Sequence, residues 1–176
     1  MSRVRPPVVT GVTRGAGTST LAAALHAVDG GVLGPGDAAA ADVLVCGADE
    51  PSLRRAAALA PQTAGPRPVL VLTGAARPAR TVPAGRFGAV LALPRLRRWV
   101  GGDARAEAAA VLAYPPERLP PDVRAYAAAL HRIVSALLAS GQLQRATPPA
   151  VAARARSTPK RPWAPACWPG PTGFPN

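Results

Sequence analysis

The stretch Val8-Val9-Thr10-Gly11-Val12-Thr13-Arg14-Gly15-Ala16-Gly17-Thr18-Ser19-Thr20-Leu21 decides the fold. It begins with β-branched residues that favour a strand, continues through three glycines, and runs into an alanine-rich segment with helical character. A strand, a glycine-rich turn and a helix in this order leave free backbone N–H groups at the start of the helix, where they can bind an anion. The stretch therefore predicts a phosphate-binding turn at the N-terminus of an α/β protein.

The rest of the chain alternates apolar runs with helical segments. The apolar runs predict buried parallel strands, and with the first strand they lie at Val8–Thr10, Gly31–Leu33, Val43–Cys46, Val69–Thr73 and Ala89–Leu93. Helices are predicted at Ser19–Ala27, Pro51–Ala60, Asp103–Leu112 and Pro121–Ser140. This alternation predicts a three-layer α/β fold, with a mostly parallel sheet of about five strands and flanking helices.

The segment Pro121–Ser140 has the clearest helical pattern. Apolar residues recur along one face, and Gly141 follows as a helix terminator. This face consists of Val123, Tyr126, Leu130, Ile133, Val134, Leu137 and Leu138. We expect the whole stripe to be buried.

The composition changes after Leu143 and divides the chain into an α/β domain over 1–143 and a tail over 144–176. Residues 145–176 contain eight prolines, five basic residues and no periodic apolar pattern, which predicts a disordered tail. Trp163, Trp168 and Phe174 lie among these prolines. They form either a short docking peptide or part of an unstructured extension.

The net charge of +12 comes from 20 arginines and one lysine against 9 acidic residues. This charge allows nucleic acid or an acidic membrane surface as a partner. Neither is favoured, because aromatic residues make up only 4% of the chain and no nucleic-acid-binding motif is present. No apolar run reaches the roughly 18 residues of a membrane helix, and no secretory signal is apparent. We therefore expect a cytoplasmic protein without a transmembrane segment.

The cysteines do not form a recognisable site. Cys46 and Cys167 have the spacing of neither a zinc site nor a disulfide framework, and Cys46 is expected in the core. His26 and His131 have no Cys, Asp or Ser partner at a readable spacing.

A basic cluster beside Trp99 follows the last predicted strand, at the strand ends where α/β proteins bind ligands. It consists of Arg95, Arg97 and Arg98. The cluster either contacts a phosphate or an acidic partner, or forms a solvated basic turn.

The glycine-rich turn is compared first with the P-loop pattern G-x-x-x-x-G-K-[ST]. Gly17 takes the place of the last glycine, Thr18 stands where the lysine belongs, and Ser19 takes the place of the magnesium-binding hydroxyl. The stretch from Gly15 to Leu25 resembles the deviant loop of MinD/ParA-type ATPases, and of their CpaE-like relatives in particular. Residues 42–54, 90–94 and 121–138 are similar to later parts of that family, so the resemblance spans about 1–143.

This resemblance implies a reduced domain that binds a nucleotide, ATP, with Mg²⁺. The nucleotide-binding residues that it implies are Arg14, Gly15, Ala16, Gly17, Thr18, Ser19 and Thr20. The magnesium-binding residues that it implies are Ser19 and Asp49, and the other candidate acids are Asp29 and Asp37.

Threonine at position 18 cannot neutralise the charge that develops in phosphoryl transfer, so we expect weak or absent hydrolysis and assign no catalytic residue. Function would then depend on partner proteins. A homodimer is one arrangement that the resemblance implies, because relatives of this type dimerise across the nucleotide.

Two alternatives remain at the sequence level. Thr10 to Gly17 also matches the T-G-x-x-x-G-x-G fingerprint of short-chain dehydrogenases. That family requires a Tyr-x-x-x-Lys pair, whereas the only lysine here is Lys160 and position 156 is Arg156, so this reading leaves an NAD(P)-binding remnant without dehydrogenase activity. The other alternative is a non-enzymatic interaction module that has lost its ligand, with the glycines forming only a tight turn.

Overall fold

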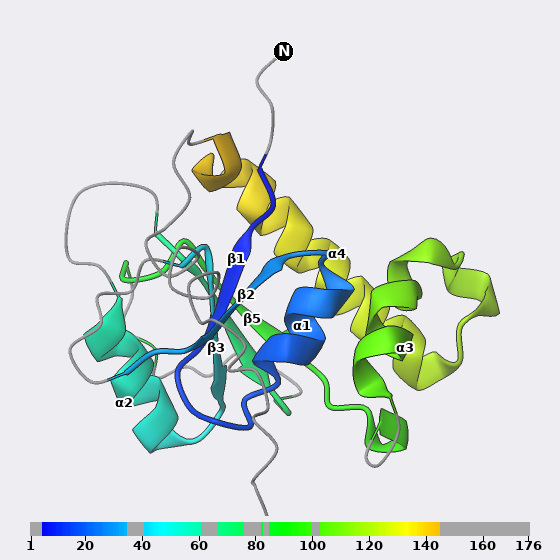
Figure 1. The fold of residues 1–176 in the computed structure, drawn as a ribbon, viewed down its shortest axis with the longest axis horizontal. Helices are drawn as coiled ribbons and strands as arrows, with labels where there is room; N and C mark the ends of the chain where they lie inside the picture. The colour runs from blue at the N-terminus through cyan, green and yellow to red at the C-terminus, as the bar shows by residue number, and fades with distance from the viewer. Residues whose placement is uncertain are drawn as a thin grey trace, which may run out of the picture.

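A five-stranded parallel sheet forms the centre of the computed structural model, which describes residues 5–34, 41–60, 67–75, 82, 85–99 and 103–144 (Figure 1). The strands are β1 (Val8–Gly11), β2 (Val28–Val32), β3 (Val43–Gly47), β4 (Val69–Thr73) and β5 (Ala89–Leu93). Their order in the sheet is β2-β1-β3-β4-β5, and every neighbouring pair is parallel. The expected α/β fold with a parallel sheet is confirmed.

The strand order reverses direction around β1. The chain moves from β1 outward to β2, then returns past β1 to β3 and continues through β4 to β5. In doubly wound sheets of this kind, ligands bind outside the carboxyl ends of the strands. The loop between β1 and the next helix lies at this edge, which we call the carboxyl edge.

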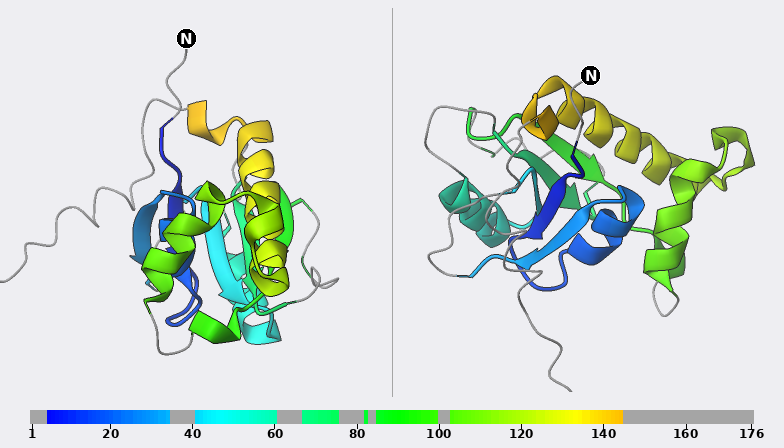
Figure 2. Two further views of the ribbon diagram at one scale, coloured as in Figure 1. Left: turned by 90° about the vertical axis from the view of Figure 1, so that its right-hand side faces the viewer. Right: turned by 45° about the horizontal axis from the view of Figure 1, so that its top comes forward.

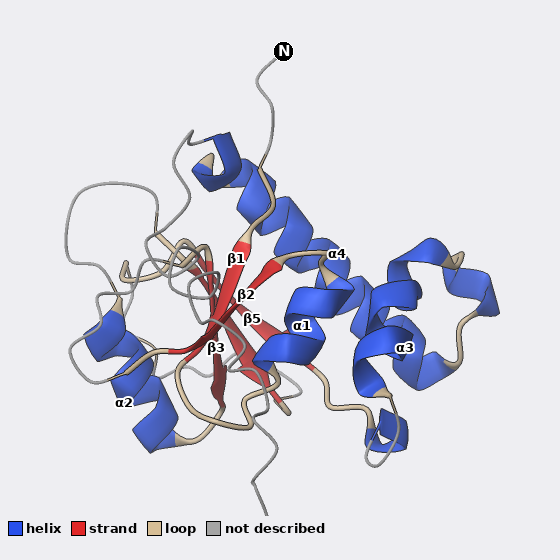
Figure 3. Cartoon of the chain, in the orientation of Figure 1, coloured by secondary structure: helices blue, strands red, loops and turns tan. Residues whose placement is uncertain are grey.

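Helices cover both faces of the sheet (Figures 1 and 3). They are α1 (Thr18–Ala24), α2 (Glu50–Leu59), α3 (Ala104–Ala110) and α4 (Pro121–Ala139), with short 3₁₀ turns η1 (Arg97–Trp99), η2 (Val111–Ala113), η3 (Pro116–Arg118) and η4 (Gln142–Gln144). Figure 2 shows α3 and α4 in front of the same sheet face, where they pack with α1 in one hydrophobic core, while α2 packs on the other face in a second core. Cys46 lies fully buried in the α2-side core, as predicted.

Alternation along the strands assigns side chains to these two cores. In β3, Val43 and Val45 face α1 and α4, whereas Leu44 and Cys46 face α2. Both faces of the central strands are therefore apolar, which explains why the sequence reads as continuous apolar runs rather than as alternating ones.

The structure corrects several predicted boundaries. β2 spans Val28–Val32 rather than Gly31–Leu33, because it is an edge strand with two glycines and shows little apolar continuity. Helix α1 ends at Ala24 rather than Ala27, because His26 adopts a left-handed backbone (φ 48°). Asp103 caps α3 rather than belonging to it, and α3 ends before the 3₁₀ turn η2.

The apolar stripe of α4 is narrower than predicted. Five of the seven residues are buried, but Val134 is only half-buried and Leu138 is 55% exposed. Each follows a buried residue directly, which turns it about 100° away from the sheet. Gly141, with φ 68°, follows the helix as expected.

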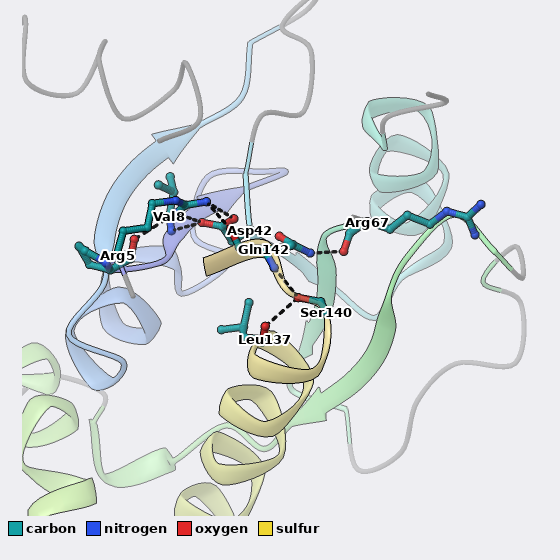
Figure 4. Close-up of polar contacts among 8 residues, drawn as sticks. Arg5, Val8, Asp42, Arg67, Leu137, Ser140 and Gln142 are labelled. Atoms are coloured by element: carbon teal, nitrogen blue, oxygen red, sulfur yellow. Dashed lines mark hydrogen bonds and ion pairs between the residues drawn. The ribbon is translucent and has the colours of Figure 1, made fainter. Parts of the chain in front are cut away.

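The edge opposite the glycine-rich turn, the amino edge, is held by a buried ion pair (Figure 4). Arg5 donates to both carboxylate oxygens of Asp42 at 2.6 and 2.8 Å, and Asp42 also accepts the Val8 N–H at 2.8 Å. Asp42 is 2% exposed. Its hydrogen bonds raise the pKa of Arg5, and the contact between the two side chains is bidentate.

Gln142, in η4, extends this network to the C-terminal end of the described chain (Figure 4). Its carbonyl accepts from Arg5 at 3.2 Å, and its side-chain amide donates to the Arg67 carbonyl ahead of β4. Ser140 receives the Gln142 N–H and donates to the Leu137 carbonyl at the end of α4. The start of β1, the start of β3 and the end of α4 are therefore joined by one polar network.

Among the described residues, no helix is long and apolar enough to cross a membrane. The predicted tail, with Cys167 and its tryptophans, lies outside the described residues, as does Asp37.

Candidate functional site

The turn between β1 and α1 has left-handed backbone at two glycines. Gly15 has φ 74° and Gly17, at the N-cap of α1, has φ 88°. Residues that carry a side chain rarely adopt such φ angles, so the backbone conformation requires glycine at both positions. No side chain caps α1, and among the described residues none accepts a hydrogen bond from the Gly15 or Gly17 N–H.

Gly11, at the end of β1, is required for a different reason. A Cβ added there would collide with Thr18 Oγ1, because the Thr18 side chain folds back over the end of the strand. Thr18 is only 7% exposed. The residue in the position of the P-loop lysine therefore packs inside the turn instead of reaching out of it.

A cleft of about 200 Å³ opens at the carboxyl edge beside this turn. Gly15, Ala16, Gly17 and Thr20 form one wall. The ends of β4 and β5 and the residues that follow β5 form its base and far wall, which consist of Thr73, Leu93, Pro94, Arg95, Leu96, Trp99, Ala104 and Tyr126. The cleft thus joins a glycine-rich backbone to an aromatic surface.

Two aromatic rings form the far wall of the cleft. Trp99 and Tyr126 meet edge to face, with ring centroids 4.9 Å apart and an interplanar angle of 77°. The indole N–H donates to Glu107 at 2.7 Å, which fixes the Trp99 ring between η1 and α3. A rigid aromatic pair of this kind offers a flat apolar surface to a planar ligand.

The Tyr126 side chain has an unusual environment. The residue as a whole is only 3% exposed, and no hydrogen bond involves its hydroxyl among the described residues. Burial raises the pKa of this hydroxyl above its ordinary value, so it stays protonated at neutral pH. Tyr126 lines the cleft, so a hydroxyl without a protein partner is a candidate contact for a ligand there.

The arginines near the turn divide between two places. Arg95 lines the cleft, but Arg14 does not and instead lines a separate cavity on the β2 side of the turn. Arg97 is exposed in η1. No ion pair engages Arg14 or Arg95 within the described ranges.

The predicted magnesium residues lie in different places: Asp49 follows the carboxyl end of β3, Ser19 lies in α1, and Asp29 lies near the amino end of β2, away from the glycine-rich turn. Asp49 is the N-cap of α2 and accepts the Ser52 N–H at 2.9 Å, which with the Ser52 hydroxyl lowers the pKa of its carboxyl. Its other oxygen folds back over Gly47 at the end of β3. Ser19 is half-buried in the first turn of α1. Asp29 accepts the Gly31 N–H within β2.

Within the described part of the chain, no group of three or more acidic, histidine or cysteine residues is arranged to hold a metal ion. Ser19 and one Asp49 oxygen suit Mg²⁺ chemically, since that ion takes oxygen ligands and is commonly held by one or two protein groups plus phosphate oxygens. The assignment of magnesium to these two residues stays a prediction, because neither of them lines the cleft.

Of the seven predicted nucleotide-binding residues, the structure brings four to the cleft. Arg14, Thr18 and Ser19 do not line it. Sequence reasoning placed Trp99 near the strand ends but assigned Tyr126 only to the core stripe. The feature that could have identified Tyr126 as a site residue is its hydroxyl-bearing aromatic side chain on an otherwise aliphatic stripe.

No protein-family model, no curated protein and no solved structure matches this chain. The dehydrogenase alternative lacks one expected feature, because β2 ends in Val32 and is followed by Leu33, with no acidic side chain for a ribose at these positions. The site is therefore interpreted from its own geometry.

Proposed function

We propose that this protein is a reduced MinD/ParA-like nucleotide-binding domain that holds ATP in the cleft, hydrolyses it weakly or not at all, and acts through a partner protein in the cytoplasm. One observation carries the proposal. The same cleft has left-handed glycines with free N–H groups on one wall and a fixed aromatic pair on the other. Phosphate and base are the two chemically different halves of a nucleotide.

The size of the cleft supports a definite orientation. A volume of about 200 Å³ lies below the roughly 300–1,000 Å³ of pockets that enclose whole ligands, so only part of a nucleotide can be enclosed. The base would lie against Trp99, with the Tyr126 hydroxyl within reach of its polar edge. The phosphates would then lie along Gly15 and Gly17, towards solvent.

The position of Thr18 supports retention rather than cleavage. In phosphoryl transfer, a cation must stabilise the charge on the transferred group. Thr18 brings no charge and packs against Gly11, away from the cleft. Arg95 is the cation that lines the cleft, and it lies across from the turn rather than within it.

Magnesium would accompany the nucleotide. Ser19 and Asp49 are the residues proposed to contact it, and the ion would neutralise phosphate charge. Because Asp49 also caps α2, its replacement should weaken binding of the magnesium complex and loosen the start of that helix together.

Calorimetric titration with ATP, with and without Mg²⁺, tests the proposal. We expect micromolar to millimolar binding that Trp99→Ala weakens at least tenfold, because the base loses its stacking surface. Tyr114→Ala is the matched control, since Tyr114 is 57% exposed and lies outside the cleft. Absence of binding at millimolar ATP, or equal losses in both variants, would refute a nucleotide site here.

Two further measurements, NADPH binding and phosphate release from ATP, separate the alternatives. NADPH binding that exceeds ATP binding would favour the dinucleotide-binding remnant, and phosphate release from bound ATP at the rate of an ordinary ATPase would refute weak hydrolysis. Gly17→Leu should abolish ATP binding, because leucine cannot adopt φ 88° and would crowd the turn.

A further inference from the structure

A second cavity lies across the glycine-rich turn from the cleft. It has a volume of about 390 Å³ and is bounded by the turn, the end of β2 and helix α2. Val12, Thr13 and Arg14 line this cavity, whereas Gly15 to Gly17 line the cleft. The two hollows therefore share a wall but no lining residue.

Two arginines from different elements line this cavity. Arg14 comes from the turn, and Arg55 comes from α2. One Nη of Arg55 donates to the Leu33 carbonyl at 3.2 Å, which fixes the direction of its guanidinium. The guanidinium group has five N–H donors, so most of those on Arg55 remain available for an anion.

No carboxylate among the described residues lines the cavity, and the nearest described acids along the chain already accept hydrogen bonds or form an ion pair. Asp29 accepts the Gly31 N–H, Asp49 accepts the Ser52 N–H, and Glu50 pairs with Arg54 at 3.2 Å. Within the described ranges, neither Arg14 nor Arg55 has an ion-pair partner. The cavity thus concentrates positive charge that nothing described here neutralises.

The remainder of the lining is mostly apolar, with Thr13 as a polar exception. Val12 and Leu33 are buried, while Val32 is 44% exposed at the rim. A bare inorganic anion would leave this apolar surface and much of the volume unused. A ligand that carries a phosphate on a small organic body would use both parts.

We propose that this cavity is a binding site for a small organic phosphomonoester. Arg14 and Arg55 hold the dianionic phosphate by charge-assisted hydrogen bonds, and the organic part packs on the exposed Val32 at the rim. The site is independent of the nucleotide cleft, and it gives Arg14 a role that the geometry of the cleft does not.

Titration with phenyl phosphate, followed by calorimetry and by amide chemical shifts, tests this site in the absence of nucleotide. We expect Arg55→Ala to weaken binding roughly ten- to a hundredfold, which corresponds to the loss of a charge-assisted hydrogen bond. Arg14→Ala should weaken it to a similar extent. Arg54→Ala is the matched control, because Arg54 is the neighbouring arginine on the same helix and is paired with Glu50 instead.

Inorganic phosphate and Trp99→Ala complete the experiment. Phenyl phosphate should bind more tightly than inorganic phosphate, and Trp99→Ala should leave its binding unchanged even if the cleft binds no nucleotide. Equal losses in the Arg54 and Arg55 variants would show a general charge effect and overturn the site. Binding that depends on Trp99, or equal affinity for the two phosphates, would overturn it as well. So would the absence of phenyl phosphate binding at a ligand concentration of about 10 mM.

Discussion

At the amino edge of the sheet the Asp42 carboxylate accepts three hydrogen bonds and is 2% exposed, whereas at the carboxyl edge the N–H groups of Gly15 and Gly17 and the hydroxyl of Tyr126 have no partner among the described residues. Both edges contain polar groups, and both lie at the ends of the same strands. At the amino edge most of these groups satisfy one another, although the Arg5 Nε has no partner among the described residues. At the carboxyl edge the residues that carry these groups line the cleft.

This difference separates stability from binding. A satisfied buried network fixes the positions of three chain segments, and it offers nothing to a ligand. Gly15 and Gly17 are exposed, so their N–H groups are open to solvent or to a ligand rather than bonded within the protein. The comparison therefore predicts that variants at the amino edge change the free energy of unfolding, and that variants at the carboxyl edge change affinity more than stability.

The largest effect is expected for Asp42→Ala. This variant leaves the Arg5 guanidinium and the Val8 N–H without their acceptor, which should lower the free energy of unfolding by about 3–5 kcal/mol. Urea denaturation measures the change. Affinity of the folded fraction for ATP should be unaltered, because the network lies at the far edge of the sheet.

Glu50→Ala serves as the control for Asp42→Ala. It breaks the Glu50–Arg54 pair, in which both side chains are 73% exposed, and should change stability by less than about 1 kcal/mol. If the two variants were equally destabilised, the amino edge would not be the structural clamp that its geometry indicates.

Gly11→Ala is expected to have the next largest effect. The added Cβ collides with Thr18, so the start of α1 must shift, at a cost of about 1–3 kcal/mol. The shift should also weaken ATP binding, since α1 carries the turn. Thr18→Ala in the same chain should restore much of both losses, and a double-mutant cycle by urea denaturation measures that coupling.

Gly15→Ala distinguishes steric from conformational strain in the turn. A Cβ at Gly15 meets nothing within 4 Å, but φ is 74°. Its cost of about 1–2 kcal/mol should therefore persist in a Thr18→Ala background. Rescue of Gly15→Ala by Thr18→Ala would contradict the assignment of separate roles to the two glycines.

The sequence was sufficient to predict the sheet because its signal is local. The buried strand Val69–Thr73 and the half-buried edge strand Ala89–Leu93 both read as unbroken apolar runs, and the structure has them at those bounds. The edge strand β2 lacks that signal, since its pairing with β1 depends on backbone contacts rather than on side-chain burial. The predicted start of this strand, Gly31, therefore lies three residues after the observed start, Val28.

The site was harder to predict because its walls come from distant parts of the chain. The turn could be identified from its glycines, but Tyr126 is more than a hundred residues further on and has the spacing of a core residue. The direction of the Thr18 side chain depends on its contact with Gly11, which spacing alone does not reveal. The Arg5–Asp42 pair likewise joins residues that no sequence pattern connects.

A pH dependence is expected at the aromatic wall of the cleft. Burial raises the pKa of Tyr126 in the folded protein above the value of about 10 in the unfolded chain, so above pH 10 the folded state keeps a proton that the unfolded state loses. Stability should therefore fall as the pH rises beyond 10, by at most about 1.4 kcal/mol per pH unit.

Urea denaturation at pH 9 and pH 11 measures the contribution of Tyr126, with Tyr126→Phe as the matched variant. The wild-type protein should lose more stability between these two pH values than the phenylalanine variant does. Equal losses would show that the Tyr126 hydroxyl is not buried against an apolar wall, and the proposed contact with a base would lose its support.

The smallest expected effect is at the other end of α1, and it has the opposite sign. Gly17 at the start of this helix and His26 after its end both have left-handed backbone, at φ 88° and 48°. The His26 N–H donates to Ala23 and the Ala27 N–H donates to Ala22, an arrangement in which glycine is the usual residue at position 26. His26→Gly should relieve strain of about 1–2 kcal/mol and add unfolded-state entropy of about 0.5–1 kcal/mol.

The net effect of His26→Gly is a gain of about 0.5–1 kcal/mol, with no change in ATP affinity, because His26 is exposed and lies outside the cleft. Thermal and urea denaturation measure the gain, and Gly17→Ala provides the opposite case at the same helix. The glycine at the ligand-binding end would then be irreplaceable for binding, while the residue at the other end would be open to improvement. A loss of stability in His26→Gly would instead mean that the histidine makes a stabilising contact that offsets its backbone strain.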